Sequence, residues 1–252
     1  MAWYVTSAIE ALAEHGERVA LSYRGRDIRY GELLADVYRT ARALRRHGLG
    51  RGDGLDGLTM GKVADRLGVR TASLYWHVRD KEALLDLLSD AVWSAHDLSG
   101  HVVPGDWRAS LVAIMRSMRR HMLSYRDSAR LFAGRFTTGR GQLRNMETLL
   151  GVLRAAGLSN RDAAYMAFVL STFLIGFVGG EQAPLSAAVS AGRSPRSYLD
   201  DLRVRFAALP AEEFPHVVEL AGELTAPDLD GRFDFALDRL VASVEALSGP
   251  RS

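Results

Sequence analysis

The residues whose types and spacing best suit a recognisable chemistry lie between Leu58 and Leu88. The stretch predicts a short helix, a turn at Gly68-Val69-Arg70 and a second short helix. Thr59 is a good N-cap for the first helix, and Gly68 is a good stop. Two short helices that cross at a glycine-containing turn form the helix-turn-helix plan, in which the second helix can lie in a DNA major groove.

The side chains expected on the outside of the second helix suit contacts with DNA. Hydroxyl groups reach base edges or phosphates, aromatic ring atoms donate to phosphates, and the small Ala72 lets the backbone approach. Lys62, Lys81 and the amides at helix N-termini add positive potential. The outward residues are Arg70, Thr71, Ser73, Tyr75, Trp76 and His77. The residue types alone leave open a surface helical hairpin whose aromatic side chains face the core.

The elements that must position this motif are predicted to be helices. Asp80 begins a longer helix that runs to about Trp93. Helical spacing of apolar residues then recurs through residues 107–247, and Ala163 to Phe177 is apolar nearly all round, as expected of a helix buried on several sides. Residues 183–229 are richer in Pro, Gly and Ser, and we expect one helix there, from Tyr198 to Ala208. The apolar stripes are Trp107, Leu111, Ile114, Met115, Met118 and Met122, then Leu143, Met146, Leu149, Leu150 and Leu153, and last Phe233, Leu237, Leu240, Val241, Val244 and Leu247.

The N-terminal part has a different pattern. A short helix over 7–15 precedes two alternating segments, Val19 to Tyr23 and Asp27 to Tyr30, which predict a β-hairpin. A helix begins at about Tyr30 and ends before a glycine-rich, basic loop over 48–54. The predicted fold class is therefore all-α with a small N-terminal β-hairpin extension. We expect an extension at residues 1–32, a helix-turn-helix DNA-binding domain at 33–95 and a helical ligand-binding and dimerisation domain at 96–252.

Composition narrows the chemistry that the chain can perform. The 252 residues include no cysteine, which excludes disulfides, thiolate metal sites and cysteine nucleophiles and suits a reducing cytoplasm. The N-terminal residues lack the pattern of a signal peptide. No nucleophile–base pair, paired-carboxylate motif or metal-ligand spacing is visible, and His96, His101 and His121 do not form one. We therefore expect no enzyme activity, no cofactor and no metal.

Net charge and hydropathy do not by themselves decide whether the chain binds nucleic acid or a membrane. A formal charge of +2 neither demands nor excludes nucleic acid. The uncharged run from Ala163 to Gly180 lies at the lower edge of membrane-spanning length. Its Ser171, Thr172 and glycines favour a buried interface helix, so we expect no membrane association.

The stretch from Leu58 to Leu88 resembles the tetracycline-repressor (TetR) family of bacterial regulators. The strongest agreement is in Leu74-Tyr75-Trp76-His77-Val78, Lys81 and Ala83-Leu84-Leu85-Asp86. From the residue types and the resemblance together, we expect DNA contacts from Thr59, Lys62, Arg70, Thr71, Ala72, Ser73, Tyr75, Trp76, His77 and Lys81. Gly61 stands where the tetracycline repressor has a base-reading arginine, so either the specificity differs or Lys62 and Arg70 carry more of it.

The resemblance continues through the helical body, over roughly residues 55–250. It implies a homodimer formed through helices at 162–180 and 232–247, double-stranded operator DNA as a partner, and a small-molecule effector bound among the central helices. Because Met and aromatic side chains adapt to irregular apolar ligands, an apolar or aromatic effector is expected. The candidate ligand residues are Met115, Met118, His121, Met122, Phe132, Phe136, Met146, Phe168, Phe173 and Phe177. Phe132 replaces the histidine that chelates the drug's magnesium in the tetracycline repressor, and a phenyl ring cannot bind metal, so no such metal–drug complex is expected.

The implied mechanism is a two-state switch in which the effector lowers operator affinity.

Residues 17–53 resemble a different family, since they are similar to the start of adenylate-forming enzymes such as acyl-CoA synthetases. The phosphate loop and second domain of those enzymes are not found in the sequence. This segment either replaces the usual first helix, with Arg39, Arg42, Arg46 and Arg51 adding phosphate contacts, or is a fusion scar that weakens DNA binding. The alternative function is a helical small-molecule carrier that has lost DNA binding.

Overall fold

A computed structural model describes residues 19–23, 26–29, 55–67, 70–75, 78–135, 139–190, 192 and 194–248, and these residues are mainly helical. Strand β1 (Val19–Tyr23) pairs antiparallel with β2 (Arg26–Arg29), and Tyr23 lies opposite Arg26. The expected helix at 7–15 and the helix from Tyr30 lie outside the described residues.

Three helices follow the predicted helix-turn-helix pattern. Helix α3 (Met60–Leu67) begins after Thr59, whose Oγ1 accepts a hydrogen bond from Lys62 N at 3.2 Å. Helix α4 (Thr71–Tyr75) follows, and α5 (Lys81–Ser94) is capped by Asp80, whose side chain accepts from Ala83 N at 2.8 Å. The predicted Thr59 cap is confirmed, and Asp80, predicted to begin the longer helix, caps it; each satisfies an amide that the first helical turn leaves free.

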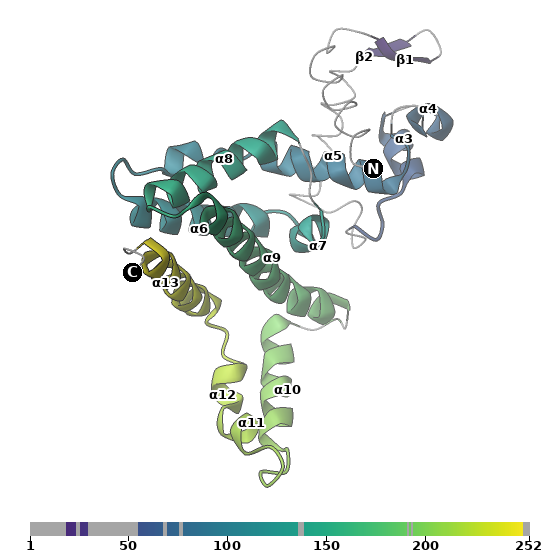
Figure 1. The fold of residues 1–252 in the computed structure, drawn as a ribbon. Coiled ribbons are helices and arrows are strands. Elements are labelled where there is room, and N and C mark those ends of the chain that lie inside the picture. Colours follow the sequence, from purple (N-terminus) through teal and green to yellow (C-terminus); the bar gives the residue numbers. More distant parts are fainter. Residues whose placement is uncertain are drawn as a thin grey trace.

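The remaining helices build a body around α9 (Figure 1). Helix α6 (Trp107–Leu123) and α8 (Arg140–Ala155) pack beside α9 (Asn160–Ser190), while α13 (Leu229–Ser248) packs on α6 and α9. A 3-10 helix (Ser99–His101) precedes α6, and the short α7 (Ser128–Phe132) contacts α5 and α9.

The segment expected to hold one helix contains more regular structure than its composition predicts. Helix α9 continues through Pro184 to Ser190, and α10 (Pro195–Ala207), α11 (Pro215–Glu219) and α12 (Ala221–Leu224) form an arm that projects from the body (Figure 1). Prolines open α10 and α11, where their missing amide costs no helical hydrogen bond. The prediction of a single helix over 183–229 was therefore wrong, because proline was treated as a helix breaker.

Ionic contacts from α6 hold α13 in place. Arg116 pairs with Asp234 at 3.0 Å, and Arg108 pairs with Glu245. Arg119 is the most enclosed of the three arginines: it bonds Glu181 of α9 and Asp230 of α13 and lies 4.7 Å from the centre of the Phe233 ring. A largely buried arginine with two carboxylates and an aromatic face fixes the relative positions of the three helices.

The residues before α3 are tied to α7. Leu55 N donates to Asp127 Oδ2 at 3.0 Å in a buried contact, and Asp56 receives two hydrogen bonds from Arg130, at 2.6 and 3.0 Å. Asp127 has φ +58°, a left-handed conformation that Asn and Asp tolerate better than other non-glycine residues. The lead into the helix-turn-helix is therefore anchored on the helical body.

Replacing Asp127 tests this anchor. Asp127→Ala leaves Leu55 N buried without its acceptor and places an alanine at positive φ, so we expect the free energy of unfolding to fall by about 2 kcal/mol. Asp127→Asn keeps an acceptor oxygen and tolerates the backbone, and should lose less than half as much. Urea denaturation measures both variants, and equal losses would contradict the role of the hydrogen bond.

Candidate DNA-binding motif and effector cavity

Helix α3 buries one face and exposes the other. Leu58, Val63 and Ala64 are buried in the core, whereas Lys62 and Asp65 are exposed. The buried face fixes α3 against the hydrophobic core of the protein.

The described DNA-contact candidates lie at the surface. Thr71 is half-buried, and the side chain of Tyr75 is 49% exposed, so this aromatic residue does not face the core as the surface-hairpin alternative requires. Lys81 Nζ donates to Leu55 O at 3.4 Å, which engages it within the protein. The other exposed candidates are Thr59, Lys62, Arg70 and Ala72. The side chain of Ser73, together with Trp76 and His77, lies outside the described residues.

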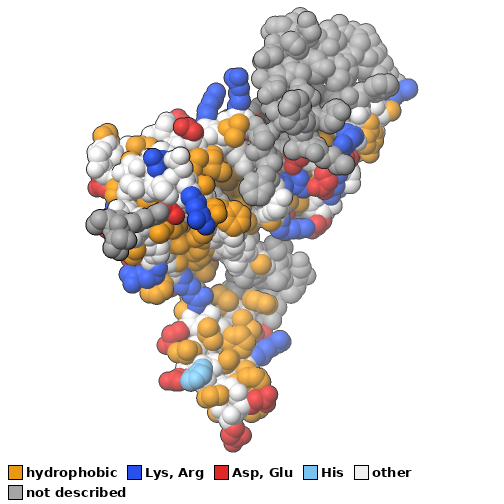
Figure 2. Space-filling view, viewed as in Figure 1, with side chains coloured by type: hydrophobic (Ala, Val, Ile, Leu, Met, Phe, Trp, Pro, Cys, Tyr) orange, Lys and Arg blue, Asp and Glu red, His pale blue; other side chains and the backbone are white. Residues whose placement is uncertain are grey.

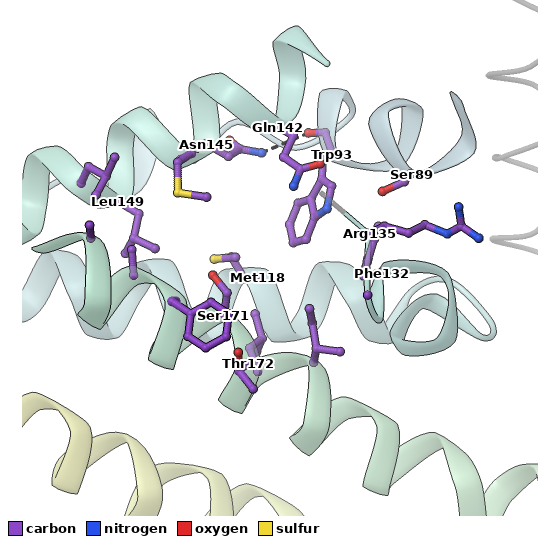
Figure 3. A pocket seen from close by; sticks show the side chains of 18 residues that line it. Ser89, Trp93, Met118, Phe132, Arg135, Gln142, Asn145, Leu149, Ser171 and Thr172 are labelled. Atoms are coloured by element: carbon purple, nitrogen blue, oxygen red, sulfur yellow. Dashed lines mark hydrogen bonds between the residues drawn. The ribbon is translucent and has the colours of Figure 1, made fainter. Parts of the chain in front are cut away.

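A cavity of about 670 Å³ opens in the helical body between α5, α6, α8 and α9 (Figure 3). This volume falls within the range typical of small-molecule sites. Most of the lining side chains are apolar, and they come from segments far apart in the sequence. The lining includes Ser89, Trp93, Met118, Phe132, Arg135, Gln142, Asn145, Met146, Leu149, Leu150, Phe168, Ser171, Thr172, Leu174 and Ile175.

The structure brings together four of the ten predicted ligand residues: Met118, Phe132, Met146 and Phe168 line the cavity. The buried Met115 and Met122 lie elsewhere in the core. His121 belongs to a histidine cluster described below. Phe173 and Phe177 pack on Phe233 of α13, with ring centroids 5.8 and 5.2 Å away, and Phe136 lies outside the described residues.

Sequence reasoning missed Trp93, which lines the cavity and stacks on Phe132 with ring centroids 4.7 Å apart. It was read only as the end of its helix, whereas the near-continuous burial of α5 from Leu84 to Trp93 places it between two layers. The apolar stripe of α8 pointed to Leu149 and Leu150 as core residues, but not to a hollow beside them.

The polar lining residue Asn145 is fully engaged. Its Nδ2 donates to Trp93 O at 3.2 Å and His96 O at 3.0 Å, and its Oδ1 accepts from Leu98 N at 3.4 Å. These bonds satisfy backbone groups where α5 ends, as helix C-termini require. Asn145 therefore connects the cavity wall to the end of α5.

Three histidines form a cluster behind Trp93. His96 stacks on His121 with ring centroids 4.3 Å apart, and His121 Nε2 lies 2.8 Å from Val92 O. Ser117 Oγ lies 3.2 Å from His96 Nε2 and 2.7 Å from His101 Nε2. Burial, followed by the proximity of His121 and His101, lowers the pKa of His96 to about 4. Within the described residues, no group of three or more His, Cys, Asp or Glu is arranged to hold a metal ion.

Comparisons with known proteins agree with this arrangement. Residues 51–88 match the family of bacterial regulatory proteins named tetR, and residues 103–248 match the tetracyclin repressor-like C-terminal domain. An HTH-type transcriptional regulator of Saccharopolyspora erythraea is 34% identical over 78% of this chain and 80% of that protein. The class A tetracycline repressor of Escherichia coli is 42% identical over 55% of this chain, and the matched part spans 64% of the repressor.

Solved structures give the same result. The TetR family protein ActR of Streptomyces coelicolor, in complex with (S)-DNPA, aligns with a TM-score of 0.72 at 32% identity, over 86% of this chain and 98% of ActR. Its complex with actinorhodin aligns with a TM-score of 0.69. The chain therefore belongs to the TetR family and is a transcriptional repressor with a ligand-binding C-terminal domain, not an enzyme.

The depressed pKa of His96 predicts how stability depends on pH. Between about 4 and the ordinary value near 6.5, the unfolded chain binds a proton at His96 that the folded chain does not, so stability rises with pH across this window. We expect the melting temperature to fall as the pH is lowered from 7 toward 4.5, and His96→Gln to fall less steeply. His216→Gln, on the exposed α11, is the matched control. Identical pH profiles for all three proteins would contradict this role of His96.

Proposed function

We propose that this protein binds operator DNA through α3 and α4 and is released when a small apolar or aromatic effector occupies the cavity. The observation that carries the proposal is the continuity of one hydrophobic core from Leu58 and Val63 of the motif, through α5, to Met118 and Leu149 at the cavity. An occupant that alters the packing of the cavity therefore acts on the same core that holds the motif in place.

Several residue assignments belong to this proposal. The DNA contacts are those predicted from sequence, with Lys81 also bonded to Leu55 O. The predicted ligand contacts that the cavity favours are Met118, Phe132, Met146 and Phe168, joined by Trp93 and Leu149. The division into an extension at 1–32, a DNA-binding domain at 33–95 and a ligand-binding domain at 96–252 is part of the same proposal, as is a cytoplasmic location.

The effector class follows from the lining. Stacked Trp93 and Phe132 offer aromatic surface, and Met118 and Met146 adapt to irregular shapes. Ser171, Thr172 and Gln142 add a few polar groups that can orient a ligand (Figure 3). ActR, which is similar to this chain, forms complexes with (S)-DNPA and with actinorhodin, and this supports a small-molecule effector here.

We also propose a homodimer through α9 and α13. Large apolar side chains are exposed on both helices: Tyr165 and Phe168 on α9 are 61% and 59% exposed, and Phe235 on α13 is 70% exposed. Such patches are uncommon on monomers and mark interaction surfaces. The segment Asn160–Ala183 is long and apolar enough to cross a membrane, and 33% of its apolar window is buried within one chain. Pairing of two chains would bury exposed apolar side chains of this segment, such as Tyr165 and Phe168.

A dimer would place two copies of α4 about 34–36 Å apart, on successive turns of DNA.

Residues 17–53 belong to neither matched family segment except at 51–53, and most lie outside the described residues. Their resemblance to adenylate-forming enzymes, and the choice between a replaced first helix and a fusion scar, remain hypotheses.

The dimer is tested by placing a charge on the proposed interface. Phe235→Asp should convert a dimer into a monomer at micromolar concentration, because the interface would bury an unpaired carboxylate. Figure 2 shows hydrophobic side chains at the surface of the projecting arm, so the arm supplies no neutral control. Leu143→Asp changes a 51% exposed residue of α8, outside the proposed interface, and should leave the mass unchanged. Light scattering after size-exclusion chromatography measures both, and a dimeric Phe235→Asp protein would place the interface elsewhere.

DNA binding is tested with the DNA upstream of the gene. If six to ten phosphates are contacted, affinity should fall by about 10³–10⁵ between 50 and 200 mM salt. Trp76→Ala should weaken binding at both salt concentrations, and fluorescence anisotropy measures the dissociation constants. A folded dimer that binds no DNA would instead support the small-molecule carrier.

The N-terminal arginines are tested in the same assay. Replacing Arg39, Arg42, Arg46 and Arg51 by alanine should reduce the salt dependence of DNA affinity only if these residues contact phosphates.

A further inference from the structure

Arg135 connects the wall of the cavity to the N-terminal half of α5. It follows α7 by one short turn, and its side chain contributes to the cavity lining. The guanidinium group points away from the centre of the cavity (Figure 3). Nη1 donates to Asp86 Oδ1 at 2.8 Å and Nη2 to Glu82 Oε2 at 2.6 Å, and both acceptors belong to α5.

Burial makes the ion pair with Asp86 the more consequential of the two. The Arg135 side chain is 15% exposed and that of Asp86 is 27% exposed, whereas that of Glu82 is 70% exposed, so the largely desolvated cation depends mainly on Asp86. Nε is buried and has no hydrogen-bond partner among the described residues. Within the described residues, the guanidinium group is therefore held mainly by side chains of α5.

The backbone around Arg135 links it to the aromatic wall of the cavity. Arg135 N donates to Phe132 O at 3.1 Å across a turn that contains Gly134, whose φ is +71°. Phe132 in turn stacks on Trp93. An occupant that moves Phe132 therefore pulls on the same turn that carries Arg135.

The two carboxylates lie at the end of α5 that is nearest in sequence to the DNA-binding motif. Glu82 is in the first turn of α5, two residues after the cap Asp80, and α4 ends at Tyr75. A helix transmits a displacement of its first turns as a nearly rigid body. Lys81, the first residue of α5, donates from Nζ to Leu55 O just before α3, and α3 packs on α4, so a movement of Glu82 and Asp86 also acts on the helix-turn-helix.

We propose that Arg135 is a positioning residue that holds α5 and α4 in the operator-binding arrangement, and that an occupant of the cavity lowers DNA affinity by loosening its contacts with Glu82 and Asp86. This inference rests on the proposed function, because it takes α4 as the DNA reader and the cavity as the effector site. Arg135 does not contact DNA in this scheme. Its effect is carried by α5.

The test compares Arg135→Met with Arg203→Met in the full-length protein. Methionine keeps an unbranched apolar stem and removes the charge, while Arg203 is exposed on α10 and supplies the same change of net charge away from α5. Affinity for the upstream DNA is measured by fluorescence anisotropy at several salt concentrations. Arg135→Met should bind about tenfold more weakly than Arg203→Met, within the range of coupling between distant sites. Its dependence on salt should equal that of the unchanged protein, because no phosphate contact is lost.

A second variant protects the test against misfolding of the first. Glu82→Gln combined with Asp86→Asn removes both acceptors' charges, and should weaken DNA binding to a similar extent. Adding Arg135→Met to it should produce little further loss, because one interaction is being removed twice. Thermal melting checks that each protein is folded.

The outcomes separate the inference from the proposed function. Binding by Arg135→Met within twofold of Arg203→Met, or losses that add fully in the combined variant, would overturn the role of Arg135 and leave the repressor intact. A smaller salt dependence in Arg135→Met would overturn it also, by showing a phosphate contact. Failure of the unchanged protein to bind its upstream DNA would overturn the proposed function itself.

Discussion

The fold depends on the burial of α5 between two groups of helices. Every residue from Leu87 to Trp93 is buried, although the stretch includes Ser89 and Asp90. One hydrophobic core continues on both sides of this helix, from Leu58 in the DNA-binding motif to Leu153 in the body. Because close-packed interiors do not deform smoothly, a change of packing on one side of α5 has to be accommodated on the other. This constraint is the physical basis of the proposed coupling between the cavity and the helix-turn-helix.

Polar contacts determine which positions of α5 and its neighbours are allowed. Asn145 holds the C-terminal end of α5 through two backbone carbonyls, and Asp127 holds the residues before α3 through Leu55 N. Gln182 adds a third link, since its Nε2 donates to Tyr125 O and Ser128 Oγ next to α7. Hydrogen bonds of this kind contribute modestly to net stability, but breaking them inside the protein is costly. They therefore favour a small number of discrete arrangements over a continuous range.

Much of the helical order could be predicted from sequence because the signals are local. Thr59 and Asp80 are caps whose acceptors lie within three residues of their donors, and the apolar stripe from Trp107 to Met122 follows one face of α6. The cavity could be predicted only in part, because a buried Met or Phe fills a core and lines a hollow with the same residue type. Met118 lines the cavity while Met115, three residues earlier, lies in the core, and no local pattern separates them. The contacts of Arg135 with α5 join residues about fifty positions apart, and no spacing in the sequence announces them.

Nuclease footprinting of the DNA upstream of the gene tests most directly whether the buried α5 joins a DNA-binding motif to an effector cavity in a dimer. A dimer that reads DNA through two copies of α4 should protect one two-fold symmetric site with half-sites about one helical turn apart. Aromatic molecules that quench the tryptophan fluorescence of the folded protein, but not that of a Trp93→Phe variant, should abolish this protection. Protection that is absent, unrelated to any symmetric site, or unaffected by molecules shown to occupy the cavity would contradict this role of α5.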